Sequence, residues 1–396
     1  MTNERKHYID WVRVLAFFIL IFFHCAMPFV TFGWEIKNSE TSVGLSRLVW
    51  WLHQWRLPLL FFISGVGIHF SLKRRSVFAF AGERIVRLFI PLFFAMFFTI
   101  PLQVYFEYTQ KGRISGSYAD FYPTVWEMVP YPEGSLTWSH MWFVVYLFVF
   151  CMLLLPVFGI FRIKALERLK TRIANAAHHP LLMMIPVLPL LYYYLTLFIR
   201  YPEQQSLLDD WFLFLSSLTL LFYGYFLAGS QPFWDACQKY RKWFLGTALV
   251  CSIFLFARYW WNMTIPKEDG SELFLYGLAN SLHIWCIILA ALGFAKQYLN
   301  FSNPFLVYAN EAVYPFYILH QTLIVAFGYY VTQWNLPILV KMILLILATF
   351  IGLALVYRWL IRPFILTRVL FGMKPRRKEL SGTITESTEL ILQRAD

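Results

Sequence analysis

The sequence predicts an all-α membrane protein, and three observations lead to this fold class. Of the 396 residues, 59% are hydrophobic and 14% are charged, and the mean hydropathy of +0.56 is far from that of soluble domains. Apolar stretches of about 20 residues, the length that crosses a bilayer, recur along the whole chain. Lys and Arg concentrate in alternate connections between them. We therefore predict a polytopic bundle of membrane-spanning helices.

Ten apolar segments are expected to be the spanning helices. In chain order they are 12–33, 49–72, 88–106, 141–161, 180–199, 211–229, 243–262, 273–295, 305–331 and 336–360. An even number of spans places both termini on one side of the membrane. The basic connections near 73–75, 84–87 and 162–172 fall on that side, and basic connections are retained in the cytoplasm. Both termini are therefore predicted to be cytoplasmic, and the net charge of +12 reflects topology, not nucleic-acid binding.

One membrane domain is expected to cover residues 1–372, followed by a polar and disordered tail at 373–396. The long outer loop, 107–140, is rich in aromatic, acidic and turn residues, which suits either a lid over a sugar site or a loop that simply packs. Four of the five cysteines fall inside predicted spans. Neither a disulfide framework nor a metal site is therefore expected.

The first apolar segment carries Arg13 and His24, and ionisable side chains are costly in a bilayer unless they face a protein interior. Their spacing of eleven residues corresponds to three helical turns, so they share one face, about 16 Å apart along the axis. A neutral imidazole takes a proton from a hydroxyl near neutral pH, which makes His24 a candidate general base. The alternative is a histidine that hydrogen-bonds across helices to hold them together. Asp10 is expected to pair with Arg13 and fix its geometry.

Two further pairs of residues are candidates for donor binding. Arg84 and Arg87 precede the third segment at a helical spacing that projects both guanidinium groups from one face, as a phosphate clamp requires. Topology alone also explains arginines at this edge. Ser64 and Gly65, in the second segment, either expose backbone to a ligand or allow two helices to approach closely.

The predicted outer half of the bundle carries other polar candidates. His140 and Trp142 open the fourth segment, and His320 lies beside a proline-containing stretch of the ninth. His53 and Arg56, near the outer end of the second segment, are weaker candidates. Together with the cytoplasmic arginine pair, these residues predict a polar cavity that runs from the cytoplasmic edge past His24 to an outer mouth.

In combination these motifs resemble the acyltransferase 3 family, multi-spanning membrane enzymes that transfer acyl groups from acyl-coenzyme A to sugars and other acceptors. The matching features are Arg13 and His24 in the first segment, Phe61-Phe-Ile-Ser-Gly65, Arg84-x-x-Arg87, His140-Met-Trp142-Phe143 and Tyr314-Pro-Phe-Tyr-Ile-Leu-His320. The resemblance covers residues 8 to about 360, with most similarity to the branch that modifies periplasmic glucans. It implies that His24 is the base and that Arg13 orients the base or the donor. It also implies that Arg84 and Arg87 hold the coenzyme's phosphates, and Ser64 and Gly65 are assigned to the same donor site.

The sequence therefore predicts an inner-membrane acyltransferase, of the class that transfers groups other than aminoacyl groups. An acetyl or succinyl group is expected to move from acyl-coenzyme A, without a metal, to a hydroxyl of a sugar, glycan or lipid-linked precursor. Direct transfer and a covalent acyl intermediate both stay open. The expected partners are donor, acceptor and membrane lipid. The alternatives are a proton-coupled secondary transporter or exporter, which buried His and Arg residues also suit, and a noncatalytic assembly factor.

Overall fold

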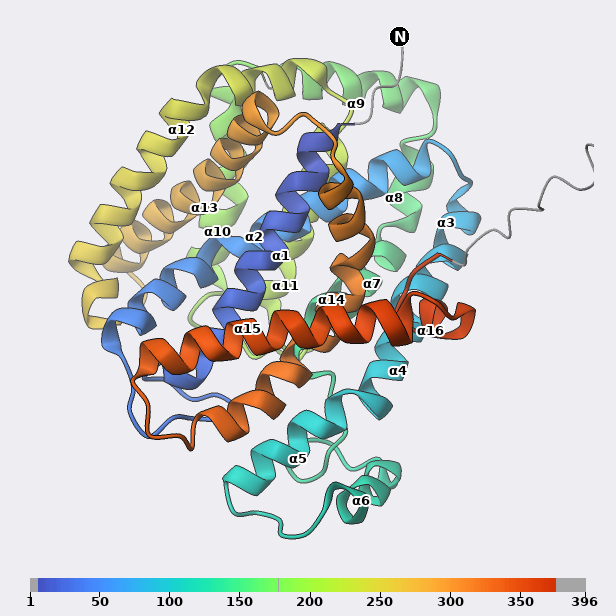
Figure 1. Ribbon diagram of the computed structural model, residues 1–396. Helices are drawn as coiled ribbons and strands as arrows, with labels where there is room; N and C mark the ends of the chain where they lie inside the picture. The colour runs from blue at the N-terminus through green and yellow to red at the C-terminus, as the bar shows by residue number, and fades with distance from the viewer. Residues whose placement is uncertain (1–5, 177, 375–396) are drawn as a thin grey trace, which may run out of the picture.

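The computed structural model describes residues 6–176 and 178–374, and within these ranges it is a bundle of helices with one isolated bridge between Pro130 and Leu136 (Figure 1). The predicted all-α class is therefore confirmed. All but the first two residues of the predicted tail, 373–396, lie outside the described residues.

Among the described residues, six helical segments are long and apolar enough to cross a membrane. They are His7–Phe29 (α1 and η1), Val43–Leu72 (α2), Val77–Gln110 (α3 to α5), Gln231–Arg258 (α12), Ser271–Tyr298 (α13) and Ile338–Ile361 (α15 and η7). Three shorter apolar segments are Ser139–Leu153 (η4 and α7), Leu182–Thr196 (η5 and α10) and Trp211–Leu227 (α11). The other described helices are α6 (Tyr118–Phe121), η3 (Tyr122–Glu127), α8 (Leu155–Ile160), α9 (Lys164–Ala176), η6 (Trp260–Asn262), α14 (Pro304–Val331) and α16 (Ile365–Leu370).

Each of the ten predicted segments overlaps at least one of these helices, which confirms a polytopic bundle. Among the described residues, however, six helical segments are long enough to span a membrane and three are shorter, so the predicted number of ten spans stays a prediction. The boundaries also differ, because backbone hydrogen bonding continues beyond the apolar stretch: α12 begins at Gln231, whereas the prediction begins at residue 243.

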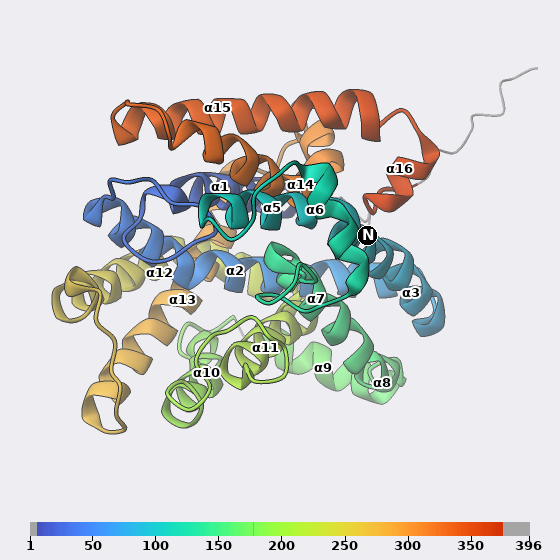
Figure 2. The same ribbon diagram turned by 90° about the horizontal axis from the view of Figure 1, so that it is seen from below.

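Helix α1 runs through the middle of the bundle and packs against α2, α13, α14 and α15 (Figure 1). Seen from below, α14 and α15 form one layer, α1 and α2 lie beneath it, and α10 and α11 lie on the far side (Figure 2). Helix α2 packs along α11, and α12 packs along α13. The side chains of α1 and α2 are thus enclosed by helices from both ends of the sequence.

Two helices present apolar side chains outward. Val250 and Ile253 on α12, and Leu339 and Ile351 on α15, are more than half exposed. Such a surface is unusual on a water-soluble monomer but is what a bilayer solvates.

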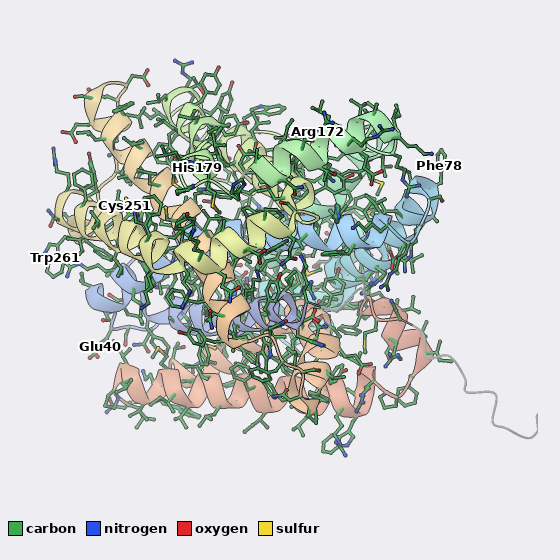
Figure 3. All side chains as sticks on the ribbon, turned by 90° about the horizontal axis from the view of Figure 1, so that it is seen from above. Glu40, Phe78, Arg172, His179, Cys251 and Trp261 are labelled. Carbon is green, nitrogen blue, oxygen red and sulfur yellow. The ribbon has the colours of Figure 1, made fainter. Side chains whose placement is uncertain are left out.

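The two ends of the bundle differ in charge. In Figure 3, Glu40 and Trp261 lie towards one end, and Phe78 and Arg172 lie towards the other. We call the end with residues 73–75, 83–87 and 162–172 the basic end, and the end with loops 30–42 and 200–210 the loop end. This segregation agrees with the distribution of charge expected from the sequence. The assignment of the basic end to the cytoplasm stays a prediction.

Two glycines bring α2 and α11 to very close range. A Cβ atom on Gly65 would overlap the carbonyl oxygen of Leu221, and a Cβ atom on Gly224 would overlap that of Phe62. The backbone of each helix therefore occupies the space that a side chain would take on the other, as in membrane helix pairs with small residues at the contact. Gly65 faces helix backbone here, which is the packing role considered for it, and half-buried Ser64 precedes it.

We expect Gly65→Ala to destabilise the protein, because the added methyl group must push α2 and α11 apart. Overpacking of this kind typically costs about 1–3 kcal/mol, so the thermal unfolding midpoint should fall by several degrees. Gly67→Ala is the matched control, since a Cβ atom at Gly67 meets nothing within 4 Å. An unfolding midpoint of Gly65→Ala equal to that of Gly67→Ala would contradict the close contact.

Candidate active site

A polar cavity of about 440 Å³ lies at the loop end of the bundle. Its walls come from α1, α2, η4, α14 and the loops that join them. Among its lining residues are His24, Glu35, His53, Arg56, His140, Trp142 and Gln321. Residues Tyr131, Thr137 and Trp138 of the long loop also line it, so this loop faces the cavity.

Three histidines from distant parts of the sequence meet at the inner wall of this cavity. The ring centroid of His320 lies 4.9 Å from that of His24 and 5.1 Å from that of His140. His320 is fully buried, whereas His24 is partly exposed and lines the cavity. The structure thus brings together three of the residues singled out in the sequence.

A chain of hydrogen bonds fixes the tautomers of two of these histidines. His320 Nδ1 lies 2.6 Å from the carbonyl oxygen of Tyr317, which can only accept, so Nδ1 carries the proton. The Nε2 atom of a neutral His320 is then an acceptor, and it lies 2.9 Å from His24 Nδ1, which must donate. His24 Nε2 is consequently left without a proton. The second nitrogen of a histidine is commonly set in this way by the bond that the first one makes.

His140 is held by other contacts. Its Nε2 donates to the carbonyl oxygen of Ile318 over 3.2 Å, and its Nδ1 lies 3.4 Å from Gln103 Nε2, which donates. Both nitrogens therefore have protein partners. Across the described residues, no group of three or more His, Cys, Asp or Glu side chains is arranged to hold a metal ion.

Glu35 is a cavity residue that the sequence interpretation did not select. Its Oε1 accepts hydrogen bonds from Ser139 Oγ at 3.0 Å and Gln321 Nε2 at 2.8 Å, while its buried Oε2 has no described partner. Burial, followed by the nearby charge of Glu107, raises the pKa of Glu35 to about 7, although both hydrogen bonds oppose the shift. Near neutral pH this carboxyl group is therefore partly protonated. In either form Oε2 has no hydrogen-bond partner among the described residues.

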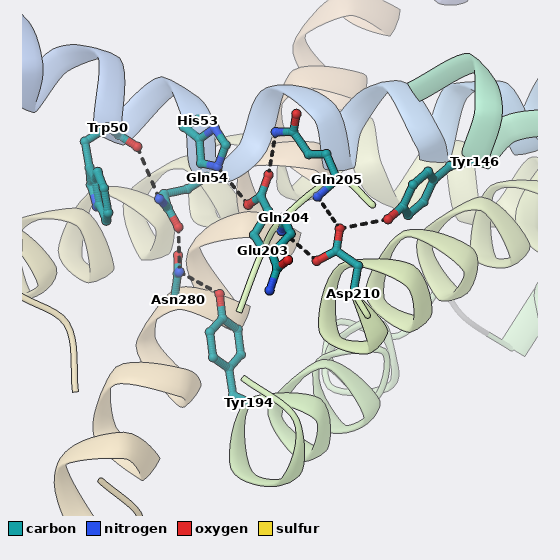
Figure 4. A network of polar contacts seen from close by, with 10 residues as sticks. All are labelled: Trp50, His53, Gln54, Tyr146, Tyr194, Glu203, Gln204, Gln205, Asp210 and Asn280. Atoms are coloured by element: carbon teal, nitrogen blue, oxygen red, sulfur yellow. Dashed lines mark hydrogen bonds and ion pairs between the residues drawn. The ribbon is translucent and has the colours of Figure 1, made fainter. Parts of the chain in front are cut away.

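A second and larger cavity, of about 860 Å³, shares Trp50, His53, Trp142 and Gln205 with the first. The loop before α11 forms part of the wall common to both, and Figure 4 shows the contacts that hold it. His53 Nε2 lies 3.0 Å from a carboxylate oxygen of Glu203, which also accepts from Gln205 Nε2 over 3.2 Å.

Asp210 fixes the other end of this loop. Its carboxylate accepts from the backbone N–H of Gln204 at 2.9 Å and from the hydroxyl of Tyr146 at 2.8 Å. Asp210 is fully buried. The wall between the cavities is thus tied to both α2 and α7.

Arg13 lies away from both cavities. Its Nη1 donates to Asp10 Oδ1 at 2.9 Å and to Asn310 Oδ1 at 3.1 Å. The predicted pairing with Asp10 is therefore confirmed. Arg13 joins α1 to α14, the helix that also carries His320, so it orients the two helices whose histidines are in contact.

Arg84 and Arg87 lie together at the basic end, on either side of Glu83. Arg84 Nη2 is 3.1 Å from Glu83 Oε2, Arg87 Nη1 is 3.5 Å from Glu83 Oε1, and Arg75 also pairs with this carboxylate. Arg87 Nε donates to the carbonyl oxygen of Gly372, whereas the buried Arg84 Nε has no described acceptor. As described, neither cavity includes Arg84 or Arg87. These two cavities therefore do not join the arginine pair to His24, and the continuous cavity expected from the sequence stays a prediction.

Fold and site together define a polytopic membrane protein with a histidine-lined polar cavity set among apolar helices. A family model described as an acyltransferase domain matches residues 6–358. The chain belongs to this family, acyltransferase 3, and is an acyltransferase. Family membership favours the enzyme over the carrier and the assembly factor.

The chain is also similar to curated relatives in Salmonella. Glucans biosynthesis protein C of Salmonella typhimurium (strain LT2) is 23% identical over 393 residues, which cover 96% of this chain and 98% of the relative. The protein of the same name from Salmonella schwarzengrund is 23% identical over 389 residues, which cover 95% and 97%. No solved structure matches the chain.

Proposed function

We propose that this enzyme moves an acyl group from acyl-coenzyme A to a hydroxyl group of a sugar, glycan or lipid-linked acceptor in the loop-end cavity. The observation that carries the proposal is the unprotonated Nε2 of His24, backed by His320 and its carbonyl partner. A hydroxyl is a weak nucleophile until a positioned base takes its proton. Acetyl and succinyl are the acyl groups that we propose.

The lining of the cavity suits a polyhydroxylated acceptor. Trp34, Trp50 and Trp138 supply flat apolar faces against which a sugar ring packs, and Gln204 and Gln321 supply amide groups for its hydroxyls. The name of the Salmonella relatives refers to glucans, which belong to this class of acceptor. The second cavity lies on the other side of their shared wall, and at about 860 Å³ it has room for further sugar units or a lipid carrier.

We assign the donor's phosphates to the basic end. Arg84 and Arg87 share a single carboxylate with Arg75, so three guanidinium groups surround one negative charge and an excess of positive charge remains. Arginine matches phosphate geometry well. The pantetheine arm would then extend along α1 towards His24, over about 16 Å measured from Arg13 along the helix axis.

Calorimetric titration of coenzyme A and acetyl-coenzyme A into the protein in nanodiscs tests this assignment. We expect saturable binding that weakens at least tenfold, or about 1.4 kcal/mol, in the Arg84→Ala/Arg87→Ala double variant. The double variant removes two of the three guanidinium groups that surround Glu83 and leaves Arg75, which is paired to that carboxylate. Arg172→Ala is the matched control, since Arg172 is an exposed cation on α9 at the same end.

Two results would count against the proposal. Equal affinity in the wild type and the double variant would remove the donor site from the basic end. Flux of a substrate across vesicles without acyl-coenzyme A, and without an acyl product, would contradict acyl transfer itself.

A further inference from the structure

Arg56 is a cation buried in the wall of the loop-end cavity. It lies on α2, its residue is 3% exposed, and it lines the same cavity as His24. The centre of its guanidinium group lies 3.2 Å from the ring centroid of Phe23, the residue before His24. The Phe23 ring thus holds the cation beside the base.

The hydrogen-bonding capacity of Arg56 is largely unused. Its buried Nε and Nη1 atoms donate to no atom of the described residues. Glu203 is a carboxylate whose charge acts on Arg56, but it is itself occupied by His53 and Gln205. A buried cation without a hydrogen-bonded anion costs free energy, so such a residue needs another reason to be there.

Other buried cations of this protein have partners. Lys341 donates to Asn38 Oδ1 at 2.7 Å and to the carbonyl oxygen of Thr332 at 3.0 Å. Arg368 forms an ion pair with Glu311 at 3.0 Å. Both are as deeply buried as Arg56. The contrast indicates that the partner of Arg56 is a group that enters the cavity.

We propose that Arg56 stabilises the negative oxygen that forms on the acyl carbonyl during transfer, an inference that rests on the proposed function. As the acceptor oxygen bonds to the carbonyl carbon, its proton passes to His24 Nε2 and the carbonyl π electrons move onto the oxygen. This oxyanion supplies the negative partner that the cation of Arg56 lacks. Collapse of the intermediate re-forms the carbonyl, breaks the carbon–sulfur bond, and releases coenzyme A as the thiol with the proton from His24.

An oxyanion fits better than a permanent anion, because a donor aimed at charge that develops only in the transition state accelerates the reaction without tightening ground-state binding. The cation–π contact with Phe23 supports the guanidinium group while no anion is present. Arg56 is on this interpretation a catalytic residue and His24 its partner.

The test compares Arg56→Gln and Arg56→Lys with the wild type in acetyl transfer to a sugar acceptor. We expect kcat to fall about 100-fold in Arg56→Gln, with KM for the donor within about twofold, and Arg56→Lys to recover part of the loss. A ketone analogue of acetyl-coenzyme A, which cannot transfer its acyl group, should bind Arg56→Gln as tightly as the wild type. Arg47→Gln is the control, because Arg47 is on the same helix and stacks on Trp261 at 3.8 Å, outside both cavities.

Each contrary outcome has a distinct meaning. Unchanged kcat in Arg56→Gln overturns the role of Arg56 while the proposed function stands. A higher KM with unchanged kcat assigns Arg56 to ground-state binding of an anionic substrate and also overturns the proposal. Weaker binding of the ketone analogue together with a lower unfolding temperature shows a structural role. A wild type that transfers no acyl group to any sugar, glycan or lipid-linked acceptor overturns the proposed function and this inference together.

Discussion

Replacement of His24 by Ala should lower kcat for acyl transfer by about 10²- to 10⁴-fold, the contribution that a positioned general base makes. His24 Nε2 is the unprotonated end of a hydrogen-bonded pair that ends at the carbonyl oxygen of Tyr317, and His24 lines the cavity. Without it, the acceptor hydroxyl must lose its proton to water. Donor binding should persist, because Arg84 and Arg87 lie at the other end of the bundle. The measurement is initial rates of acyl transfer together with calorimetric titration of coenzyme A.

His179→Ala is the matched control, since His179 is exposed at the surface and lies outside both cavities (Figure 3). It should retain full activity. A His24→Ala protein with wild-type kcat would assign the histidine to helix packing. If His24→Ala lost coenzyme A binding as well as activity, the variant would be misfolded. Replacement of His24 by Phe or Leu would then also lose both binding and activity.

The fold could be predicted from the sequence because a bilayer imposes simple demands. Apolar stretches near 20 residues had to be helical, since the hydrocarbon core offers no other partner for the backbone. The extension of α12 back to Gln231 could not be predicted in this way, because many of the residues there are polar and hydropathy marks only the apolar part of a helix. The sequence allowed two roles for Gly65, exposure of backbone to a ligand or close approach of two helices. The position of α11 against α2 shows the second role.

The candidate site was only partly visible in the sequence. His24 and the Asp10–Arg13 pair stand out because ionisable residues inside an apolar segment are rare. The contact of His24 with His320 joins residues 296 positions apart, which no local pattern reports. Glu35 falls in a polar loop between two predicted spans, where an acidic residue is common and gives no signal of a site. It becomes a candidate only because the loop folds over the cavity and buries its carboxyl group there.

The basic pair at the other end shows the opposite case. The spacing of Arg84 and Arg87 predicted two guanidinium groups on one face, and both lie side by side. The carboxylate between them is Glu83, which precedes Arg87 by four residues, a spacing that pairs charges on a helix, and which directly precedes Arg84. If the donor binds here as proposed, its phosphates must compete with the Glu83 carboxylate for these arginines.

His320→Leu should lower kcat by about 10²- to 10³-fold, although His320 touches no substrate in the proposed mechanism. The imidazole accepts from His24 Nδ1, and this bond keeps the proton of His24 away from Nε2. With Leu in its place, His24 is free to turn and to carry its proton on the catalytic nitrogen, and a wrong tautomer in a comparable triad costs about 10⁴-fold. The loss here should be smaller, because the Phe23 ring, which contacts that of His24 at a centroid distance of 5.3 Å, still restricts it.

His320→Gln distinguishes this positioning role from simple packing, since its amide oxygen can accept from His24 Nδ1 as the imidazole nitrogen does. We expect the Gln variant to recover at least tenfold of the activity that Leu loses, with an unchanged KM for donor and acceptor. The pH at which kcat reaches half its maximum should shift in the Leu variant and return towards the wild-type value in the Gln variant. The reason is that an acceptor for His24 Nδ1–H stabilises the protonated imidazole more than the neutral one. If Leu and Gln variants are equally impaired and share the wild-type pH profile, His320 only fills space between α1 and α14, and the proton position on His24 must be set by the bound acceptor.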